Sequence, residues 1–323
     1  MRRREFVALL GSALAWPLVA RAQQRARRPR VGVLIFSTPR GDPGTESLLS
    51  GLRELGYEEG RNIDIEYRFA EGRTERLAEL ARELVAIKPD LLIALGGDVT
   101  PFVSQATKTI PIIYASSADP VGLGLAESLN KPGGNATGVT FLSDELAAKR
   151  LEVLKEAAPR ISRVGLLRDP SHVDNELLLA QRAAVALGIQ LQSVEMHGRA
   201  DLDRALNAAA RAGIDALYVV SSRHTVLNVL PIVEFAAANR LPLAGGWGAW
   251  VEAGGLVSYG PNVGDMVRHS AVYVDKVLKG ARPGELPIEQ PTRFELMVNL
   301  RTAKTLGLSI PEAFLLRADK VIE

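Results

Sequence analysis

The stretch Arg30-Val31-Gly32-Val33-Leu34 returns as Arg163-Val164-Gly165-Leu166-Leu167, and this repetition decides the fold. After each copy come, in the same order, a helical stretch, an extended segment, a Leu- and Ala-rich helix, and an acidic residue that opens an apolar run (Asp90 or Asp215). The period of about 130 residues is far longer than the roughly 20 to 50 residues of solenoid repeats. The chain is therefore predicted to form two similar α/β lobes with a cleft between them.

The apolar runs are nearly continuous, which is typical of parallel strands that are buried on both faces. Because strands and helical stretches alternate along the chain, we expect parallel sheets with helices on both faces. The clearest helix spans residues 262–280, with Asn262 as its N-cap and Gly280 at its end. Residues 293–300 are expected to form one more strand and residues 301–306 a short helix. This tail has no counterpart in the first copy and is expected to cross back between the lobes.

The first 22 residues have the pattern of a secretory signal peptide. A basic start at Arg2-Arg3-Arg4 precedes an apolar stretch from Phe6 to Ala20, which is too short to span a membrane, and Ala20-Arg21-Ala22 fits a cleavage site. Arg3-Arg4-Glu5-Phe6 also resembles the twin-arginine export pattern, so the general secretory and twin-arginine routes both remain open. We expect cleavage after Ala22 and a soluble mature protein in the periplasm.

Charge and cysteine content exclude several classes of function. The whole chain has a formal net charge of +2, and removal of the signal segment, with four Arg and one Glu, leaves about −1. No region combines basic and aromatic residues densely, so nucleic-acid binding is not expected. The chain has no cysteine, which excludes disulfides, cysteine-based metal sites and thiol nucleophiles. We expect neither a metal nor a cofactor.

The loops at the predicted strand ends contain the candidate site. In open parallel α/β sheets, ligands bind beyond the carboxyl ends of the strands. These loops are rich in Ser, Thr and Gly, whose hydroxyl and backbone N–H groups suit a carboxylate or another small anion. The candidate ligand-binding residues are Ser37, Thr38, Gly97, Asp98, Ser116, Ser117 and Asp119 in the first copy and Arg168, Ser221, Ser222, Trp247 and Tyr259 in the second.

The charged residues in these loops indicate which groups a ligand carries. Asp98 and Asp119 are placed to accept hydrogen bonds from an ammonium group, and Arg168 or Arg223 to pair with a carboxylate. A structural explanation exists for Asp119, because Asp119-Pro120, like Asp169-Pro170, fits a helix N-cap followed by proline. The alternatives of capping and ligand binding both remain open for Asp119.

Aromatic residues are scarce, at 5% of the chain, yet several fall at cleft-side strand ends. Phe141, Trp247 and Tyr259 are placed where they would stack on an apolar or planar ligand. Trp250 is expected to pack in the interior instead. Ser221, like Ser116, equally fits a simple strand end without a ligand role.

Sequence motifs of common enzymes are missing. The sequence contains no G-x-x-x-x-G-K-[ST], H-E-x-x-H or G-x-S-x-G motif, and its four histidines lack the spacing of metal ligands. His224, beside Arg223, is the only histidine near a predicted cleft loop. The sequence therefore favours binding without catalysis, with an exported α/β hydrolase acting in the cleft as the alternative.

Several long segments resemble one known family, the ABC transporter substrate-binding proteins that include tryptophan- and tyrosine-type members. The segments are 110–125, which begins Ile-Pro-Ile-Ile-Tyr-Ala-Ser-Ser-Ala-Asp-Pro, 129–139, 256–262, 273–280 and 289–300, with the tail to 322. The resemblance covers essentially the whole mature chain. Where members bind aromatic amino acids, it implies contacts from Ser116, Ser117 and Asp119 on one lobe and from Ser221 and Trp247 on the other.

The same resemblance implies a type I periplasmic-binding-protein fold, with two Rossmann-like lobes joined by a hinge of crossing segments. We expect residues 28–142 with 260–288 to form one lobe and residues 143–259 with 289–323 to form the other. The implied function is capture of a small carboxylate-bearing solute, an amino acid among the possibilities, by closure of the cleft. The implied partner is a membrane permease with its ATPase, and the protein is expected to act as a monomer.

Overall fold

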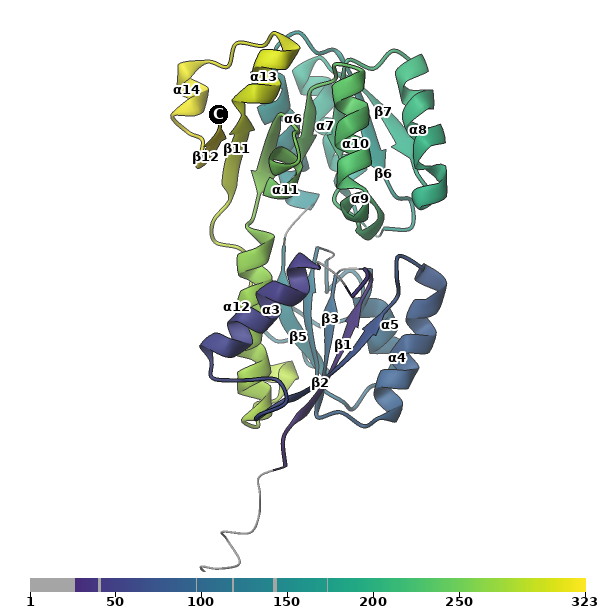
Figure 1. Ribbon diagram of the computed structural model, residues 1–323, viewed down its shortest axis with the longest axis vertical. Helices are drawn as coiled ribbons and strands as arrows, with labels where there is room; N and C mark the ends of the chain where they lie inside the picture. The colour runs from purple at the N-terminus through teal and green to yellow at the C-terminus, as the bar shows by residue number, and fades with distance from the viewer. Residues whose placement is uncertain (1–26, 40–41, 97, 118, 142–143, 173) are drawn as a thin grey trace, which may run out of the picture.

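The computed structural model describes residues 27–39, 42–96, 98–117, 119–141, 144–172 and 174–323. The expected signal peptide, residues 1–22, and the candidate residue Gly97 lie outside them. Figure 1 shows two α/β lobes, one above the other along the long axis of the molecule. Each lobe is built around its own sheet, as the sequence repeat predicts.

The N-terminal lobe consists of β1 (Arg30–Ile35), α3 (Pro43–Glu54), β2 (Asp64–Phe69), η1 (Thr74–Arg76), α4 (Leu77–Ala86), β3 (Leu91–Leu95), α5 (Thr100–Ala106), β4 (Ile112–Ser116) and β5 (Ala136–Thr140), with α12 (Val263–Leu278) and η3 (Pro283–Glu285) from later in the chain. Its five strands are parallel and follow the order β2-β1-β3-β4-β5. Helices α3 and α12 cover one face, and α4 and α5 cover the other.

The C-terminal lobe consists of η2 (Asp144–Leu146), α6 (Ala147–Ala157), β6 (Arg163–Arg168), α7 (Glu176–Leu187), β7 (Gln190–Glu195), α8 (Arg199–Arg211), β8 (Ala216–Val219), α9 (Arg223–Leu227), α10 (Val229–Ala238), β9 (Leu243–Gly245), α11 (Gly248–Glu252), β10 (Val257–Gly260), β11 (Glu295–Asn299), α13 (Leu300–Leu306), α14 (Glu312–Leu315) and β12 (Lys320–Ile322). Its strand order is β12-β11-β10-β9-β8-β6-β7. Strands β6 to β10 thus repeat the order of β1 to β5, and β11 runs antiparallel to β10.

The repeat extends to individual hydrogen bonds. The backbone N–H of Arg30, the first residue of β1, donates to the carboxylate of Asp90 at 2.7 Å. The N–H of Arg163, at the start of β6, donates to Asp215 at 2.8 Å. Each aspartate immediately precedes the neighbouring strand, so it joins the starts of two adjacent parallel strands. The acidic residue that opens each apolar run in the sequence therefore has the same structural role in both lobes.

The glycine in the middle of each repeated stretch is required by close packing. A Cβ atom on Gly32 would lie 2.7 Å from Leu92 Cδ2, and one on Gly165 would lie 2.9 Å from Ile214 Cδ1. Real Cβ atoms do not approach carbon so closely, because interiors are already packed to the density of organic crystals. Leucine and isoleucine side chains therefore occupy the space that the glycines leave open.

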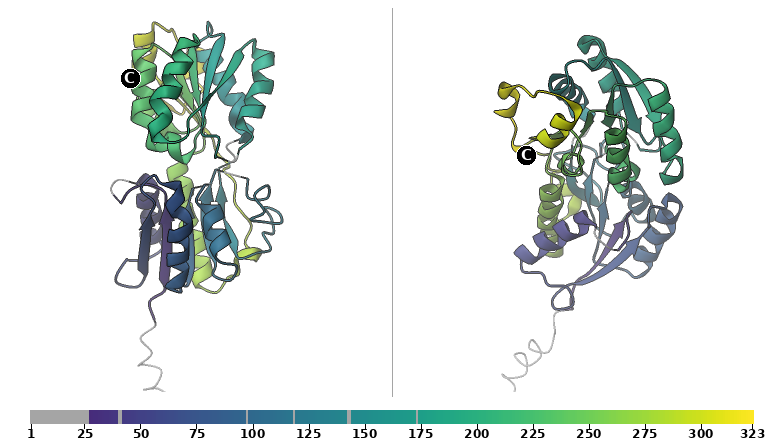
Figure 2. Two further views of the ribbon diagram at one scale, coloured as in Figure 1. Left: turned by 90° about the vertical axis from the view of Figure 1, so that its right-hand side faces the viewer. Right: turned by 45° about the horizontal axis from the view of Figure 1, so that its top comes forward.

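The polypeptide passes between the lobes three times: between β5 and η2, between β10 and α12, and between η3 and β11. Figure 2 shows the two lobes from two further sides, with α12, in light green, beginning at their junction. The second passage leads into α12, where the Asn262 side chain accepts a hydrogen bond from the Asp265 N–H at 3.1 Å, as expected for an N-cap. In the described part of the chain, every helix is too short or too polar to traverse a bilayer.

The two Asp-Pro pairs do not begin helices, contrary to the capping interpretation. Asp119 Oδ1 accepts from the Val121 N–H at 2.9 Å, and Asp169 Oδ1 accepts from the Ser171 N–H at 2.9 Å. In both places the chain forms a turn rather than a helix. An aspartate that bonds to the backbone two residues further on stabilises such a turn as readily as a helix start, which explains why the sequence signal is ambiguous.

Candidate ligand-binding site

A cavity of about 140 Å³ lies between the two lobes. Both lobes contribute to its wall through the loops that follow β1, β3, β4 and β5 on one side and β8 and β9 on the other. The lining residues are Ile35, Phe36, Ser37, Asp42, Leu95, Gly96, Asp98, Val99, Ser117, Phe141, Ser221, Ser222, Arg223, Val226, Leu227 and Trp247. The cavity therefore occupies the position that the rule for parallel sheets predicts, beyond the carboxyl ends of the strands.

The apolar part of the wall includes an aromatic pair from different lobes. The rings of Phe141, after β5, and Trp247, after β9, meet edge to face with centroids 6.3 Å apart. Trp247 is placed by Gly245 and Gly246, because a Cβ atom on Gly245 would lie 2.2 Å from Trp250 and one on Gly246 would lie 2.7 Å from Arg150. The close approach of these two large side chains fixes the backbone from which Trp247 reaches the cavity.

Trp250 is fully buried below this loop, and its Nε1 donates to Ser221 Oγ at 3.4 Å. Arg150 supports the same loop from another direction: its side chain is fully buried, pairs with Glu176 at 2.5 Å and donates from Nε to the Tyr259 carbonyl at 2.9 Å. These two side chains connect the Trp247 loop to the core of the C-terminal lobe. The expectation that Trp250 packs in the interior is confirmed.

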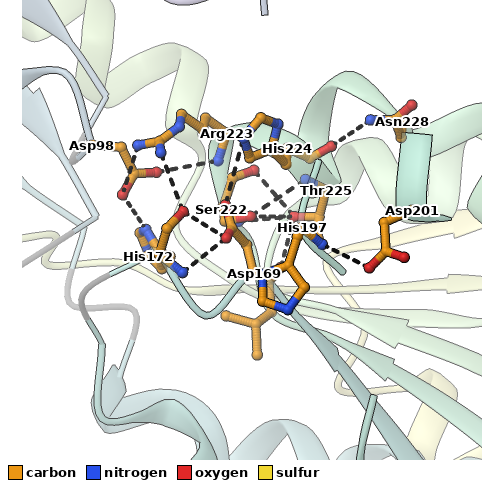
Figure 3. A network of polar contacts seen from close by, with 12 residues as sticks. Asp98, Asp169, His172, His197, Asp201, Ser222, Arg223, His224, Thr225 and Asn228 are labelled. Atoms are coloured by element: carbon orange, nitrogen blue, oxygen red, sulfur yellow. Dashed lines mark hydrogen bonds and ion pairs between the residues drawn. The ribbon is translucent and has the colours of Figure 1, made fainter. Parts of the chain in front are cut away.

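The polar end of the cavity is an ion-pair network that joins the lobes (Figure 3). Asp98, from the loop between β3 and α5, contacts His172 Nδ1 at 2.7 Å and the Arg223 guanidinium at 3.4 Å. The Arg223 guanidinium also lies 5.0 Å from the centroid of the Phe36 ring, and His224 meets the same ring edge to face. The Asp98 carboxylate and the Phe36 ring of the N-terminal lobe thus contact three side chains of the C-terminal lobe, His172, Arg223 and His224.

The charges in this network shift the pKa values of its members. Burial alone would raise the pKa of Asp98, but the hydrogen bond and charge of His172, together with Arg223, bring it below its ordinary value. Burial alone would lower the pKa of His172, but Asp98, Asp174 and Glu176 bring it above its ordinary value. The geometry therefore favours an ionised Asp98 in contact with a protonated His172.

A second hollow of about 240 Å³ adjoins the first and shares Ser117 with it. It is more polar and again receives residues from both lobes, and its lining residues are Ser117, Asp119, Pro120, Leu129, Thr140, Asp144, Glu145, Asn175, Leu179 and Gln290. Burial raises the pKa of Asp144 to about 6, while the Asn175 N–H that it accepts at 2.9 Å acts in the opposite direction. The two hollows together offer an apolar compartment beside an acidic one.

The structure brings most of the candidate residues from the sequence to these hollows. Ser37, Asp98, Ser117, Ser221, Ser222 and Trp247 line the first, and Asp119 lines the second together with Ser117. Thr38 lies exposed beside Ser37, and Ser116 is buried at the end of β4.

Besides Thr38 and Ser116, two further candidates line neither hollow. Arg168 pairs with Glu195 at 3.0 Å, because the register of β6 and β7 places these two residues next to each other. Tyr259 lies within β10, with its ring 6.1 Å from that of Phe294. Neither lines a hollow described above.

Several lining residues escaped the sequence analysis. Phe36, Leu95, Val99, Val226 and Leu227 are apolar residues just before or after the predicted loops, and only their position beside a strand end marks them. His172 lies four residues beyond the end of β6, in a loop whose length hid it from the strand-end rule. Within the described residues, no group of His, Asp and Glu side chains is arranged to hold a metal ion.

Comparisons with known proteins agree with this architecture. A tyrosine-binding protein of Clostridioides difficile (strain R20291) is 28% identical over 274 residues, which cover 84% of this chain and 78% of that protein. A crystal structure of a conserved domain protein from Vibrio cholerae is 30% identical, with a TM-score of 0.84, and covers 91% of this chain and all of that chain. A Streptococcus pneumoniae ABC domain in complex with L-tryptophan is 26% identical, also with a TM-score of 0.84 and the same coverage.

The model of one protein family, described as ABC transporter substrate binding protein, matches residues 31–322. This match spans both sheets and all the loops that line the two hollows. The chain therefore belongs to the ABC transporter substrate-binding protein family.

Proposed function

We propose that this protein is the solute-binding component of an ABC import system and that it binds a small aromatic amino acid between its lobes. The observation that carries the proposal is the cavity of about 140 Å³, with Phe36, Phe141 and Trp247 in its wall and hydroxyl groups at its edge. Ligand sites are typically apolar clefts with a few placed polar groups, and this cavity has that composition. The ligands named for two of the relatives, tyrosine and L-tryptophan, belong to the same class.

The size of the cavity favours a side chain with a single ring. An apolar cavity of about 150 Å³ in another protein accommodates one benzene molecule. By that measure the present cavity, at about 140 Å³, suits the ring of tyrosine or phenylalanine better than an indole. Trp247 Nε1 is buried without a hydrogen-bond partner among the described residues, and a tyrosine hydroxyl would accept a hydrogen bond from it. We therefore place L-tyrosine first among the ligands.

The amino and carboxylate groups of such a ligand would lie in the second hollow. Ser117 belongs to both hollows, so a ligand that passes it places its ring in one and its polar end in the other. Asp119 is exposed there and can accept hydrogen bonds from an ammonium group. Asp98 is less suited to that role, because His172 and Arg223 already contact it. The hydroxyl groups of Ser117 and Thr140 would serve the carboxylate.

Binding would be coupled to closure of the lobes. We take residues 28–142 with 260–288 and residues 143–259 with 289–323 as the two moving bodies, and the three passages between the lobes as the hinge. A ligand that touches both lobes stabilises the closed form because it binds that form better than the open one. The mature, exported protein would then deliver the solute, as a monomer, to a membrane permease and its ATPase.

A thermal-shift assay with a panel of L-amino acids tests this function. L-Tyrosine should raise the unfolding temperature, and at a free concentration of 100 times Kd linkage predicts about 2.7 kcal/mol of stabilisation. The bound ligand should be recovered unchanged and in stoichiometric amount by mass spectrometry. A flat response to every amino acid would contradict the proposed ligand class, and chemical turnover of the ligand would support an exported hydrolase instead.

A further inference from the structure

Among the described residues, the side-chain polar contacts of Asp98 are all made to the other lobe. Its carboxylate follows β3 of the N-terminal lobe, whereas His172 and Arg223 follow β6 and begin α9 of the C-terminal lobe. The side chains of Asp98, His172 and Arg223 are only 6%, 2% and 8% exposed. Figure 3 shows that His172 and Arg223 approach the same carboxylate. Opening of the lobes would therefore separate Asp98 from both partners and expose all three side chains to water.

His172 faces several other charged groups, and nearly all belong to its own lobe. Besides Asp98, the groups that act on it are Asp144 from η2, Asp174 before α7, Glu176 at the start of α7, and Arg223 through the shared carboxylate. The acids of the C-terminal lobe remain near His172 whether the lobes are open or closed. Of the charged groups that act on His172 in the described part of the chain, Asp98 is the one that departs with the other lobe.

We propose that His172 is a proton-binding site between the lobes and that a proton bound there favours the closed form. Closure brings the Asp98 carboxylate within 2.7 Å of Nδ1, and a protonated imidazole donates a charge-assisted hydrogen bond to it. The proton thus acts as a second ligand of the closed protein, at a position separate from the apolar compartment. By reciprocity, closure strengthens proton binding by the same factor by which the proton strengthens closure.

The direction of the effect follows from the contacts. In the closed form Asp98, Asp174 and Glu176 together raise the pKa of His172 above its ordinary value, even though burial alone would lower it. Loss of Asp98 on opening removes one of these causes. The gain in closure is therefore complete below the pKa of the open form and is lost as pH rises through the pKa of the closed form.

His224 gives an opposing contribution that the test must separate. Its ring meets Phe36 of the N-terminal lobe, and burial lowers its pKa, with Asp169 at 3.8 Å acting in the other direction. Closure that buries His224 further would release a proton rather than take one up. Removal of this histidine should therefore make the response of the protein to pH steeper, whereas removal of His172 should abolish or reverse it.

The test measures lobe closure as a function of pH in the full mature chain without added ligand. Because the chain has no cysteine, Arg82→Cys on α4 and Asn207→Cys on α8 place one fluorophore pair on exposed positions of the two lobes. Figure 1 shows α4 and α8 on the same side of the molecule. Energy transfer between about pH 5 and pH 8.5 then reports the interlobe distance across the titration range of histidine.

We expect the closed population to rise as pH falls, with the ratio of closed to open changing about tenfold for each unit of pKa difference between the two forms. His172→Gln should abolish this slope, or reverse it through His224, and His197→Gln, an exposed control on the C-terminal lobe, should retain it. His224→Gln should make the slope steeper.

Asp98→Asn provides a second variant that preserves side-chain size and should likewise remove the rise of the closed population at low pH. Circular dichroism establishes that each variant is folded. A flat wild-type response, or an unchanged slope in His172→Gln, would overturn the proposal. Because no amino acid is added, either result is independent of whether L-tyrosine is the ligand.

Discussion

The rings of Phe141 and Trp247 meet at 89° between the lobes, one from the end of the N-terminal sheet and one from the C-terminal sheet. Trp247 also packs against the apolar cores of both lobes. Edge-to-face aromatic pairs contribute about 0.5–1.5 kcal/mol beyond their buried area. Trp247 is thus both part of the cavity wall and part of the contact that forms when the lobes close.

Trp247→Ala should therefore weaken ligand binding without unfolding the protein. We expect an increase in the Kd for L-tyrosine of at least about tenfold, which corresponds to about 1.4 kcal/mol, measured by isothermal titration calorimetry. Trp250→Ala is the matched comparison, because Trp250 is fully buried below the same loop. That change should instead lower the free energy of unfolding by about 3–5 kcal/mol. Unchanged affinity in Trp247→Ala would remove this residue from the site.

Glu176→Gln should destabilise the C-terminal lobe strongly. Glu176 and Arg150 form an ion pair at 2.5 Å with side chains 1% and 0% exposed, and removal of one charge leaves the other buried without compensation. We expect a loss of about 3–5 kcal/mol in chemical denaturation. The control is Glu195→Gln, because Glu195 is 48% exposed and Arg168 16% exposed, and this more accessible pair should be worth less than about 1 kcal/mol. If Glu176→Gln and Glu195→Gln lowered the free energy of unfolding equally, burial of the ion pair would not explain the effect.

The glycines of the repeat should tolerate alanine poorly. Gly32→Ala and Gly165→Ala place a methyl group less than 3.0 Å from a leucine and an isoleucine, respectively, and such overpacking costs about 1–3 kcal/mol. Gly134→Ala is the control, because a Cβ atom there would have no neighbour within 4 Å. Urea denaturation measures all three. If Gly32→Ala and Gly165→Ala were as stable as Gly134→Ala, the packing explanation of the repeat would be wrong.

Asp144→Asn should stabilise the protein at neutral pH but not in acid. Burial raises the pKa of Asp144 to about 6 from an ordinary value of 3.8, so folding opposes its ionisation. The loss of stability that this causes is absent below pH 3.8, where the carboxyl is protonated in the folded and in the unfolded chain. It is complete above pH 6, where the carboxyl is ionised in both. Because the group is partly exposed, we expect a gain of about 1 kcal/mol at neutral pH.

The measurement for Asp144→Asn is thermal unfolding at several pH values. Asparagine keeps an oxygen that can accept the hydrogen bond of the Asn175 N–H. Asp203→Asn on α8, where the side chain is 77% exposed, is the control and should change little at any pH. A stabilisation of Asp144→Asn that persisted undiminished at low pH would show that ionisation is not its cause.

Much of the fold was predictable because it is local and repeated. The apolar runs, the aspartates that precede them and the central glycines Gly32 and Gly165 all have structural roles that a single sequence reveals, and the matching strand orders of the two sheets confirm the repeat. The Asp-Pro pairs misled because a carboxylate stabilises a turn and a helix start by similar hydrogen bonds. The antiparallel direction of β11 follows from its return from the other lobe and has no local signal.

The site was less predictable because it is assembled from both lobes. The strand-end rule found Ser117, Asp119 and Trp247, but it also selected Arg168, whose partner is determined by the register of β6 against β7. The contact between Asp98 and His172 joins residues 74 positions apart on different lobes. No periodicity or spacing in the sequence indicates that pair, because it depends on how the two lobes face each other.

The most direct test of the central claim is isothermal titration of the mature protein with L-tyrosine. We predict saturable binding of one L-tyrosine per chain, with a negative heat-capacity change from burial of the ring between the lobes. L-Phenylalanine should bind at the same site and L-tryptophan more weakly, because the cavity of about 140 Å³ suits a single ring. If none of the three aromatic amino acids bound saturably, the proposal that this protein binds an aromatic amino acid between its lobes would be wrong.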